Sequence, residues 1–181
     1  LISDVDSFEK YQKDRAWTWE HQALVRARPI VGSDDIIKEF ERIRKEVLCT
    51  KRDDDKLKED VKSMRQKMRQ HLDRTSDKLY DIKQGPGGMI DVEFISQYLL
   101  LKYAPLKSDF KLWTDNVRIL QECERLEIID ENTCKTLIDA YIQIREIYHD
   151  LSLADLPRLV SKEHRLEATF KVEEIYQKLL S

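Results

Sequence analysis

Apolar residues recur every three or four positions along most of the chain, which is the spacing of a helix that packs one face against a core. The pattern is clearest in a helix predicted from Asp54 to Thr75. Its apolar stripe consists of Leu57, Val61, Met64, Met68 and Leu72. Because this periodicity dominates the whole chain, the sequence predicts an all-α protein.

Capping residues and prolines set the limits of the other predicted helices. Asp6 and Glu9 have the spacing of a capping box, which opens a first helix. That helix continues to Ala27, and Pro29 ends it. The remaining helices are predicted to begin at or just after Ser33, Ile90, Thr114, Asp130 and Ser161. The chain therefore contains about seven predicted helices.

The segment from Ile90 to Tyr103 is apolar on nearly every side, which is typical of a central buried helix. A short extended segment, residues 79–83, and a glycine-rich loop, residues 84–88, come directly before it. We find no internal repeat, low-complexity tract or long linker. The sequence thus predicts a single helical-bundle domain over residues 1–181, with one glycine-rich loop between the extended segment and the buried central helix.

Composition narrows the class of protein further. The chain has only 4 glycines, three of them between Gln84 and Gly88, which excludes a turn-rich all-β architecture. Its 32 basic and 35 acidic residues give a net charge of −3, which argues against a nucleic-acid partner. The 3 widely spaced cysteines are typical of reduced thiols in a cytoplasmic protein, and no apolar run is long enough to cross a membrane. Because the chain opens at Leu1, we expect a fragment of a larger protein.

The glycine-rich loop is the strongest local signal for chemistry. It joins an extended segment to a helix start, so free backbone N–H groups and the positive end of the helix could cradle an anion. Lys83 would add a positive charge, although no Gly-Lys-Ser/Thr follows as in a phosphate-binding P-loop. A tight turn that lets two backbones pack closely explains the glycines equally well. Both interpretations remain open at this point.

Two carboxylates, Asp91 and Glu93, follow the glycine pair. Residues two apart lie on roughly opposite faces of a helix, so a single metal ion held by both is not expected. The helix dipole accounts for Asp91 at the helix start. Glu93 falls inside an apolar run and needs a partner, because a buried unpaired carboxylate is costly. The favoured partners are the arginines at positions 26, 28, 65 and 69.

Basic residues form another group of candidates. Lys62, Arg65 and Arg69 share one helical face, for which a solvated surface is the usual explanation. Nucleic-acid binding through that face is the least favoured function. Arg26 and Arg28 follow a tryptophan-rich stretch and are candidates for contact with nucleotide phosphates. The four histidines lack metal-ligand spacing, so no metal site is predicted.

Four stretches of this chain resemble bacterial glutamine synthetase adenylyltransferase. They are residues 16–28 (AWTWEHQALVRAR), 64–69 (MRQKMR), 81–95 (DIKQGPGGMIDVEFI) and 113–120 (WTDNVRIL). The resemblance is ordered and covers nearly the whole chain. The form WEHQAL resembles the second, C-terminal transferase half of that two-headed enzyme.

The resemblance implies a role in nitrogen regulation. The full enzyme uses ATP and Mg²⁺ to transfer AMP to a tyrosine of glutamine synthetase, its other half removes the AMP, and the PII signalling protein and glutamine control both. The family's metal-binding carboxylates lie on a nucleotidyltransferase sheet that should precede residue 1, so we expect no catalytic residue here and no activity from the isolated chain.

The resemblance also assigns roles and partners within this chain. Lys83, Gly87 and Gly88 are expected to face the nucleotide. Structural roles around them fall to Arg26, Arg28, Asp91 and Glu93. The expected partners are glutamine synthetase, PII and the nucleotidyltransferase domain of the same chain, with no nucleic acid and no membrane. The alternative is a non-enzymatic helical module that docks on glutamine synthetase or PII.

Overall fold

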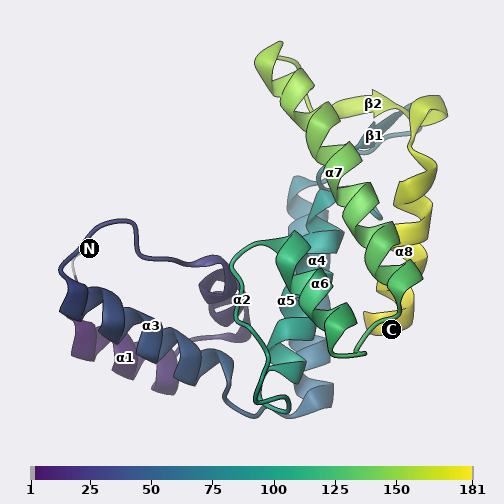
Figure 1. The fold of residues 1–181 in the computed structure, drawn as a ribbon. Coiled ribbons are helices and arrows are strands. Elements are labelled where there is room, and N and C mark those ends of the chain that lie inside the picture. Colours follow the sequence, from purple (N-terminus) through teal and green to yellow (C-terminus); the bar gives the residue numbers. More distant parts are fainter. Residues whose placement is uncertain (1–2, 181) are drawn as a thin grey trace.

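A computed structural model describes residues 3–180 and shows a helical protein with one small antiparallel ribbon (Figure 1). The elements are α1 Val5–Asp14, α2 Thr18–Arg26, α3 Asp34–Leu48, α4 Asp54–Leu72, β1 Leu79–Asp81, α5 Met89–Tyr103, α6 Asn116–Arg125, α7 Glu131–Leu153, β2 Leu159–Ser161 and α8 Glu167–Leu180. The all-α prediction is confirmed, with eight α-helices in the described residues against about seven predicted. None of these helices is both long enough and apolar enough to span a bilayer.

Helix α5 lies at the centre of the bundle, as its sequence predicts. It contacts α2, α4, α6, α7 and α8, and most of its side chains are buried. Val92, Ile95 and Leu100 are completely excluded from solvent. Helix α5 carries apolar side chains on all of its faces. Burying it between five helices therefore stabilises the fold more than placing it at the surface would.

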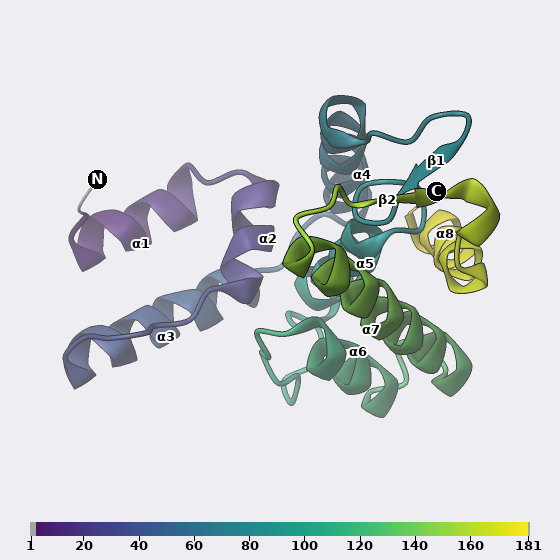
Figure 2. The same cartoon turned by 90° about the horizontal axis from the view of Figure 1, so that it is seen from above.

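Helices α1 and α3 form an arm on one flank of the bundle, and α2 joins the arm to it (Figure 2). Within the arm, the rings of Phe8 and Phe40 stack with their centroids 5.9 Å apart. Arg42 on α3 also forms ion pairs with Glu9 on α1 and with Glu46. Helix α2 contacts α3 on the arm side and α4 and α5 on the bundle side, so its end is fixed against the centre of the fold.

The single first helix predicted from Asp6 to Ala27 is wrong, because the chain breaks it into α1 and α2. Trp17 has extended backbone, and its N–H donates to the Glu20 side chain at 2.9 Å. Glu20 therefore caps the start of α2 and favours a new helix over a continuous one. The predicted capping box is also wrong, since Asp4 caps α1 by accepting from the N–H of Ser7 at 2.8 Å.

Three other predicted boundaries differ from the structure. Asp115, and not Thr114, caps α6 by accepting from the N–H of Arg118. Helix α4 ends at Leu72 instead of Thr75. Ser161 ends strand β2 and caps a short 3-10 turn, so the last helix begins later than predicted. The strand pairing Tyr80↔Val160 was not predicted, because the second strand is only three residues long and carries no periodicity.

His21 on α2 contacts both helix α1 and the segment between α3 and α4. Its Nε2 lies 2.9 Å from the backbone oxygen of Gln12, and its Nδ1 lies 3.2 Å from a guanidinium nitrogen of Arg52. Because a guanidinium only donates, Nδ1 accepts and the proton of the neutral ring is on Nε2. Burial lowers the pKa of His21 below its ordinary value of 6.5.

We expect His21 to make folding less stable as the pH falls. The folded protein keeps the ring neutral, whereas the unfolded chain takes up a proton as the pH falls through 6.5. Below pH 6.5, this single group therefore lowers the free energy of unfolding by at most about 1.4 kcal/mol per pH unit. Urea unfolding of the protein and of His21→Gln at pH 7.5 and 5.5 measures it. The variant should show the smaller pH dependence, and equal slopes would contradict this role.

Candidate functional site

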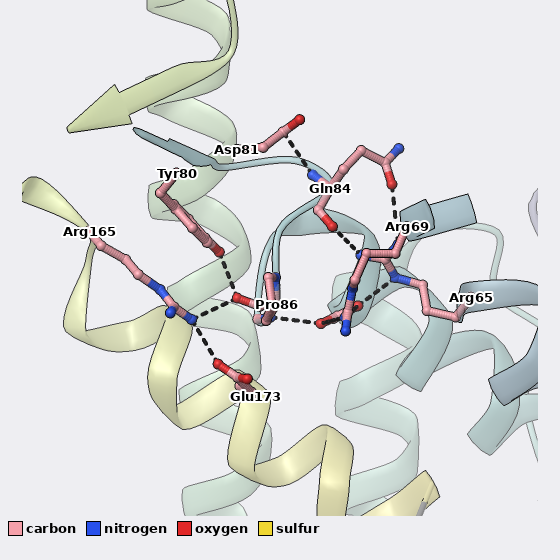
Figure 3. A network of polar contacts seen from close by, with 10 residues as sticks. Arg65, Arg69, Tyr80, Asp81, Gln84, Pro86, Arg165 and Glu173 are labelled. Carbon is pink, nitrogen blue, oxygen red and sulfur yellow. Dashed lines mark hydrogen bonds and ion pairs between the residues drawn. The ribbon is translucent and has the colours of Figure 1, made fainter. Parts of the chain in front are cut away.

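The backbone of the glycine-rich loop hydrogen-bonds to groups within the chain (Figure 3). The carboxylate of Asp81 accepts from the N–H groups of Lys83 and Gln84, at 3.0 and 2.9 Å. The N–H of Gly87 donates to Asp91 at 2.7 Å, and that of Gly88 donates to a loop carbonyl at 2.9 Å. The expectation of free N–H groups that cradle an anion is therefore wrong. Nucleotide contact by Gly87 and Gly88 stays a prediction without that support.

Close packing explains the glycines. Gly87 has a φ of +71°, and a Cβ there would lie 1.8 Å from the backbone oxygen of Thr169 on α8. A Cβ on Gly88 would lie 2.8 Å from the backbone oxygen of Ile82. The loop is also held by Pro86, whose carbonyl accepts from the Tyr80 hydroxyl and from Arg165 (Figure 3). These contacts confirm the tight-turn interpretation.

Asp91 connects α5, α4 and the loop through a buried ion pair. Its carboxylate accepts from Nε of Arg65 at 2.5 Å and from Nη2 of Arg69 at 2.9 Å, and Arg65 and Asp91 are each about 1% exposed. Arg65 also donates to the backbone oxygen of Gln84 at 2.7 Å. The helix dipole alone is thus an insufficient account of Asp91. The predicted solvated face with Lys62 is wrong for Arg65, which is buried and unable to contact nucleic acid.

Glu93 points away from Asp91, as the helical spacing predicts. It accepts from Nη1 of Arg26 on α2 at 2.7 Å and lies 3.4 Å from the hydroxyl of Tyr141 on α7. The predicted pairing of Glu93 with an arginine is confirmed, and the partner is Arg26. Arg28 follows α2 as an exposed residue and pairs with neither carboxylate.

Helix α7 places three residues on the same side of α5 as Glu93. The sequence pattern did not single them out as candidates for the site. Tyr141, Arg145 and Tyr148 follow one another at spacings of four and three and so share a helical face. The ammonium of Lys83 lies 4.9 Å from the ring centre of Tyr148. Burial and the nearby charge of Glu93 raise the pKa of Tyr141, while Arg26 and Arg145 lower it, which places these charges around one hydroxyl.

We call this set the α2–α7 face; it consists of Arg26, Lys83, Glu93, Tyr141, Arg145 and Tyr148. A cavity of about 240 Å³ opens beside it and is lined by Tyr141, Arg145, Glu146 and His149, among others. The periodicity of α7 was visible in the sequence, but only the fold shows that this stripe meets Glu93 and Lys83.

Comparison with known families gives two matches that follow one another along the chain. Residues 1–43 match glutamate-ammonia ligase adenylyltransferase, and residues 48–179 match GlnD PII-uridylyltransferase. The chain belongs to the GlnD PII-uridylyltransferase family. The uridylyltransferase match covers the bundle from α4 to α8, whereas the adenylyltransferase match covers α1, α2 and most of α3. Both families are nucleotidyltransferases of nitrogen regulation, which supports that role for this helical domain.

A divalent metal does not fit the two carboxylates that follow the glycines in this PII-uridylyltransferase family member. Magnesium prefers carboxylate oxygens and water. The carboxylates that follow the glycines, Asp91 and Glu93, instead pair with arginines and lie on different sides of α5. Residues 3–180 contain no group of three or more His, Cys, Asp or Glu side chains that could hold a metal ion. No step of a reaction is therefore assigned to a metal here.

Proposed function

We propose that this chain is the helical accessory domain of an enzyme that transfers AMP from ATP to a tyrosine of glutamine synthetase. The match of residues 1–43 to glutamate-ammonia ligase adenylyltransferase carries this proposal. It supports an adenylyltransferase beside the longer match of residues 48–179 to PII-uridylyltransferase, and the WEHQAL stretch is our reason for proposing its C-terminal half. The other half of that enzyme would remove the AMP under the control of PII.

The site geometry supports an accessory role over a catalytic one. Asp91 holds the glycine loop and two arginines in place, and Glu93 holds Arg26. Both carboxylates are committed to positioning other groups. We propose that ATP and Mg²⁺ are bound mainly by a nucleotidyltransferase domain of the same chain, and that the α2–α7 face forms a wall of the cleft through Lys83. Residues 1–181 form one domain in this proposal, although residues 1, 2 and 181 lie outside the described part.

A second candidate is a non-enzymatic module that docks on glutamine synthetase or PII. Exposed apolar side chains on the arm and on the two segments that join its helices to α2 favour it, because large apolar surfaces mark protein contacts. The most exposed of them are Trp17, Ile30, Val31 and Ile36.

The test incubates a full-length enzyme that contains this domain with labelled ATP or UTP and with glutamine synthetase or PII. We expect AMP on a tyrosine of glutamine synthetase, identified by mass spectrometry, and no labelling by the isolated chain under the same conditions. UMP on PII instead would replace the adenylyltransferase with a uridylyltransferase. Labelling by the isolated chain would overturn the accessory role. Binding of the isolated chain to glutamine synthetase or PII, together with nucleotide transfer that proceeds without this domain, would favour the docking module.

A further inference from the structure

The α2–α7 face contains positive charges that the fold does not neutralise. Arg145 is exposed and takes part in no hydrogen bond or ion pair of the described residues. Lys83 contacts the ring of Tyr148 and no carboxylate within the described part. Several other arginines form ion pairs, among them Arg42, Arg65, Arg125 and Arg158, whereas Arg15 and Arg28 form none within the described residues.

The cations are arranged in a row along α7. Arg26 is held next to Tyr141 by Glu93, Lys83 lies over Tyr148, and Arg145 lies between the two tyrosines on the same helical face. Seven residues of an α-helix rise by about 10 Å, which sets the length of the row. A compact monoanion would touch one of these cations, whereas a chain of two or three linked phosphates can reach all of them.

The carboxylates near this face do not neutralise the positive charge of the row of cations. Glu93 and the cavity-lining Glu146 oppose three cations, so one net positive charge remains among these groups. Glu93 binds Nη1 of Arg26 and so orients its guanidinium. A planar guanidinium held on one side can still donate from its other nitrogens, which suits bidentate contact with phosphate oxygens.

We propose that Arg26, Lys83 and Arg145 form a binding site for a polyphosphate chain, in which Glu93 is the positioning residue for Arg26. This site deepens the proposed function and rests on it for the source of the polyphosphate. That source is a nucleoside triphosphate or the pyrophosphate that nucleotidyl transfer releases. Arg145 is a part of the site that the glycine-rich loop gave no reason to expect.

Isothermal titration of the 181-residue chain with ATP, pyrophosphate and AMP, without magnesium, tests the site directly. ATP and pyrophosphate should both bind, AMP should bind at least several-fold more weakly, and added salt should weaken all three. Arg145→Ala should weaken pyrophosphate binding roughly tenfold, since a charge-assisted hydrogen bond is lost. Binding of ATP without pyrophosphate would overturn the polyphosphate site and point to the base and sugar instead.

Arg15→Ala is the matched control, because Arg15 is an exposed arginine without a side-chain partner in the described residues and lies at the end of α1. It should leave binding unchanged. Equal weakening by Arg15→Ala and Arg145→Ala would mean that only net charge matters, and it would overturn the site. Circular dichroism of each variant shows that it is folded, and Arg145→Lys should recover part of the affinity.

Kinetics of the full-length enzyme separate this inference from the proposed function. Glu93→Gln should raise the KM for the nucleotide several-fold with little change in kcat, and Glu93→Asp should recover part of the effect. If glutamine synthetase is labelled but Arg145→Ala and Glu93→Gln both leave KM unchanged, the site is wrong and the proposed function stands. If pyrophosphate binding depends on Arg145 but glutamine synthetase is not labelled, the site stands and the proposed function falls.

Discussion

Gly87→Ala is expected to destabilise the protein by about 2–5 kcal/mol. The positive φ of +71° costs an alanine roughly 1–2 kcal/mol. The new methyl group would also lie 1.8 Å from the backbone oxygen of Thr169, and forced overpacking of a well-packed region adds roughly 1–3 kcal/mol or more. The obstacle is backbone in α8, which has no rotamer that could make room. We therefore expect α8 to be displaced from the glycine-rich loop.

Urea unfolding followed by circular dichroism measures this effect, and hydrogen exchange of α8 locates it. Gly32→Ala is the matched control, because its Cβ would meet only side-chain atoms at 3.7 Å or more. Gly32 is exposed, and its substitution should change the free energy of unfolding by less than about 0.5 kcal/mol. Equal stability of the two alanine variants would show that α8 does not pack on the loop as described.

Asp91→Asn is also expected to lower the free energy of unfolding strongly, by about 3–5 kcal/mol. Asparagine keeps the shape and an oxygen that can accept from Gly87, but it removes the negative charge. Arg65 would then remain 1% exposed and ionised beside a neutral amide. Breaking a buried ion pair by removing one partner is far more damaging than losing the pair altogether, because the remaining charge is uncompensated.

The comparison that decides this prediction uses two other carboxylates. Glu93→Gln should cost only about 1 kcal/mol, since its partner Arg26 is 43% exposed and water can solvate it. Asp139→Asn, which removes an exposed pair with Lys135, should have almost no effect. Free energies of unfolding at neutral pH provide the measurement. A cost for Asp91→Asn no larger than that for Glu93→Gln would contradict the structural role of the buried pair.

Much of the fold follows from local sequence patterns. The apolar side chains on all faces of α5 predicted its central position. Asp130 was also correctly expected at the start of α7, where its carboxylate accepts from the N–H of Thr133 at 2.8 Å. The spacing of Asp91 and Glu93 also predicted that they face apart. These properties depend on residues within one or two helical turns, so a single stretch of sequence contains the information. The break between α1 and α2 was missed because the Glu20 side chain offered the backbone an alternative to a continuous helix.

The candidate site was determined only in part by sequence. The sequence by itself identified the glycine-rich loop, Lys83 and an arginine partner for Glu93. Tertiary structure alone decided that the loop N–H groups are already bonded and that Gly87 meets α8. It also decided that Arg145 belongs to the same face as Lys83. Helical periodicity shows which residues share a face, but the partner of that face depends on packing between segments far apart in the chain, which local spacing does not encode.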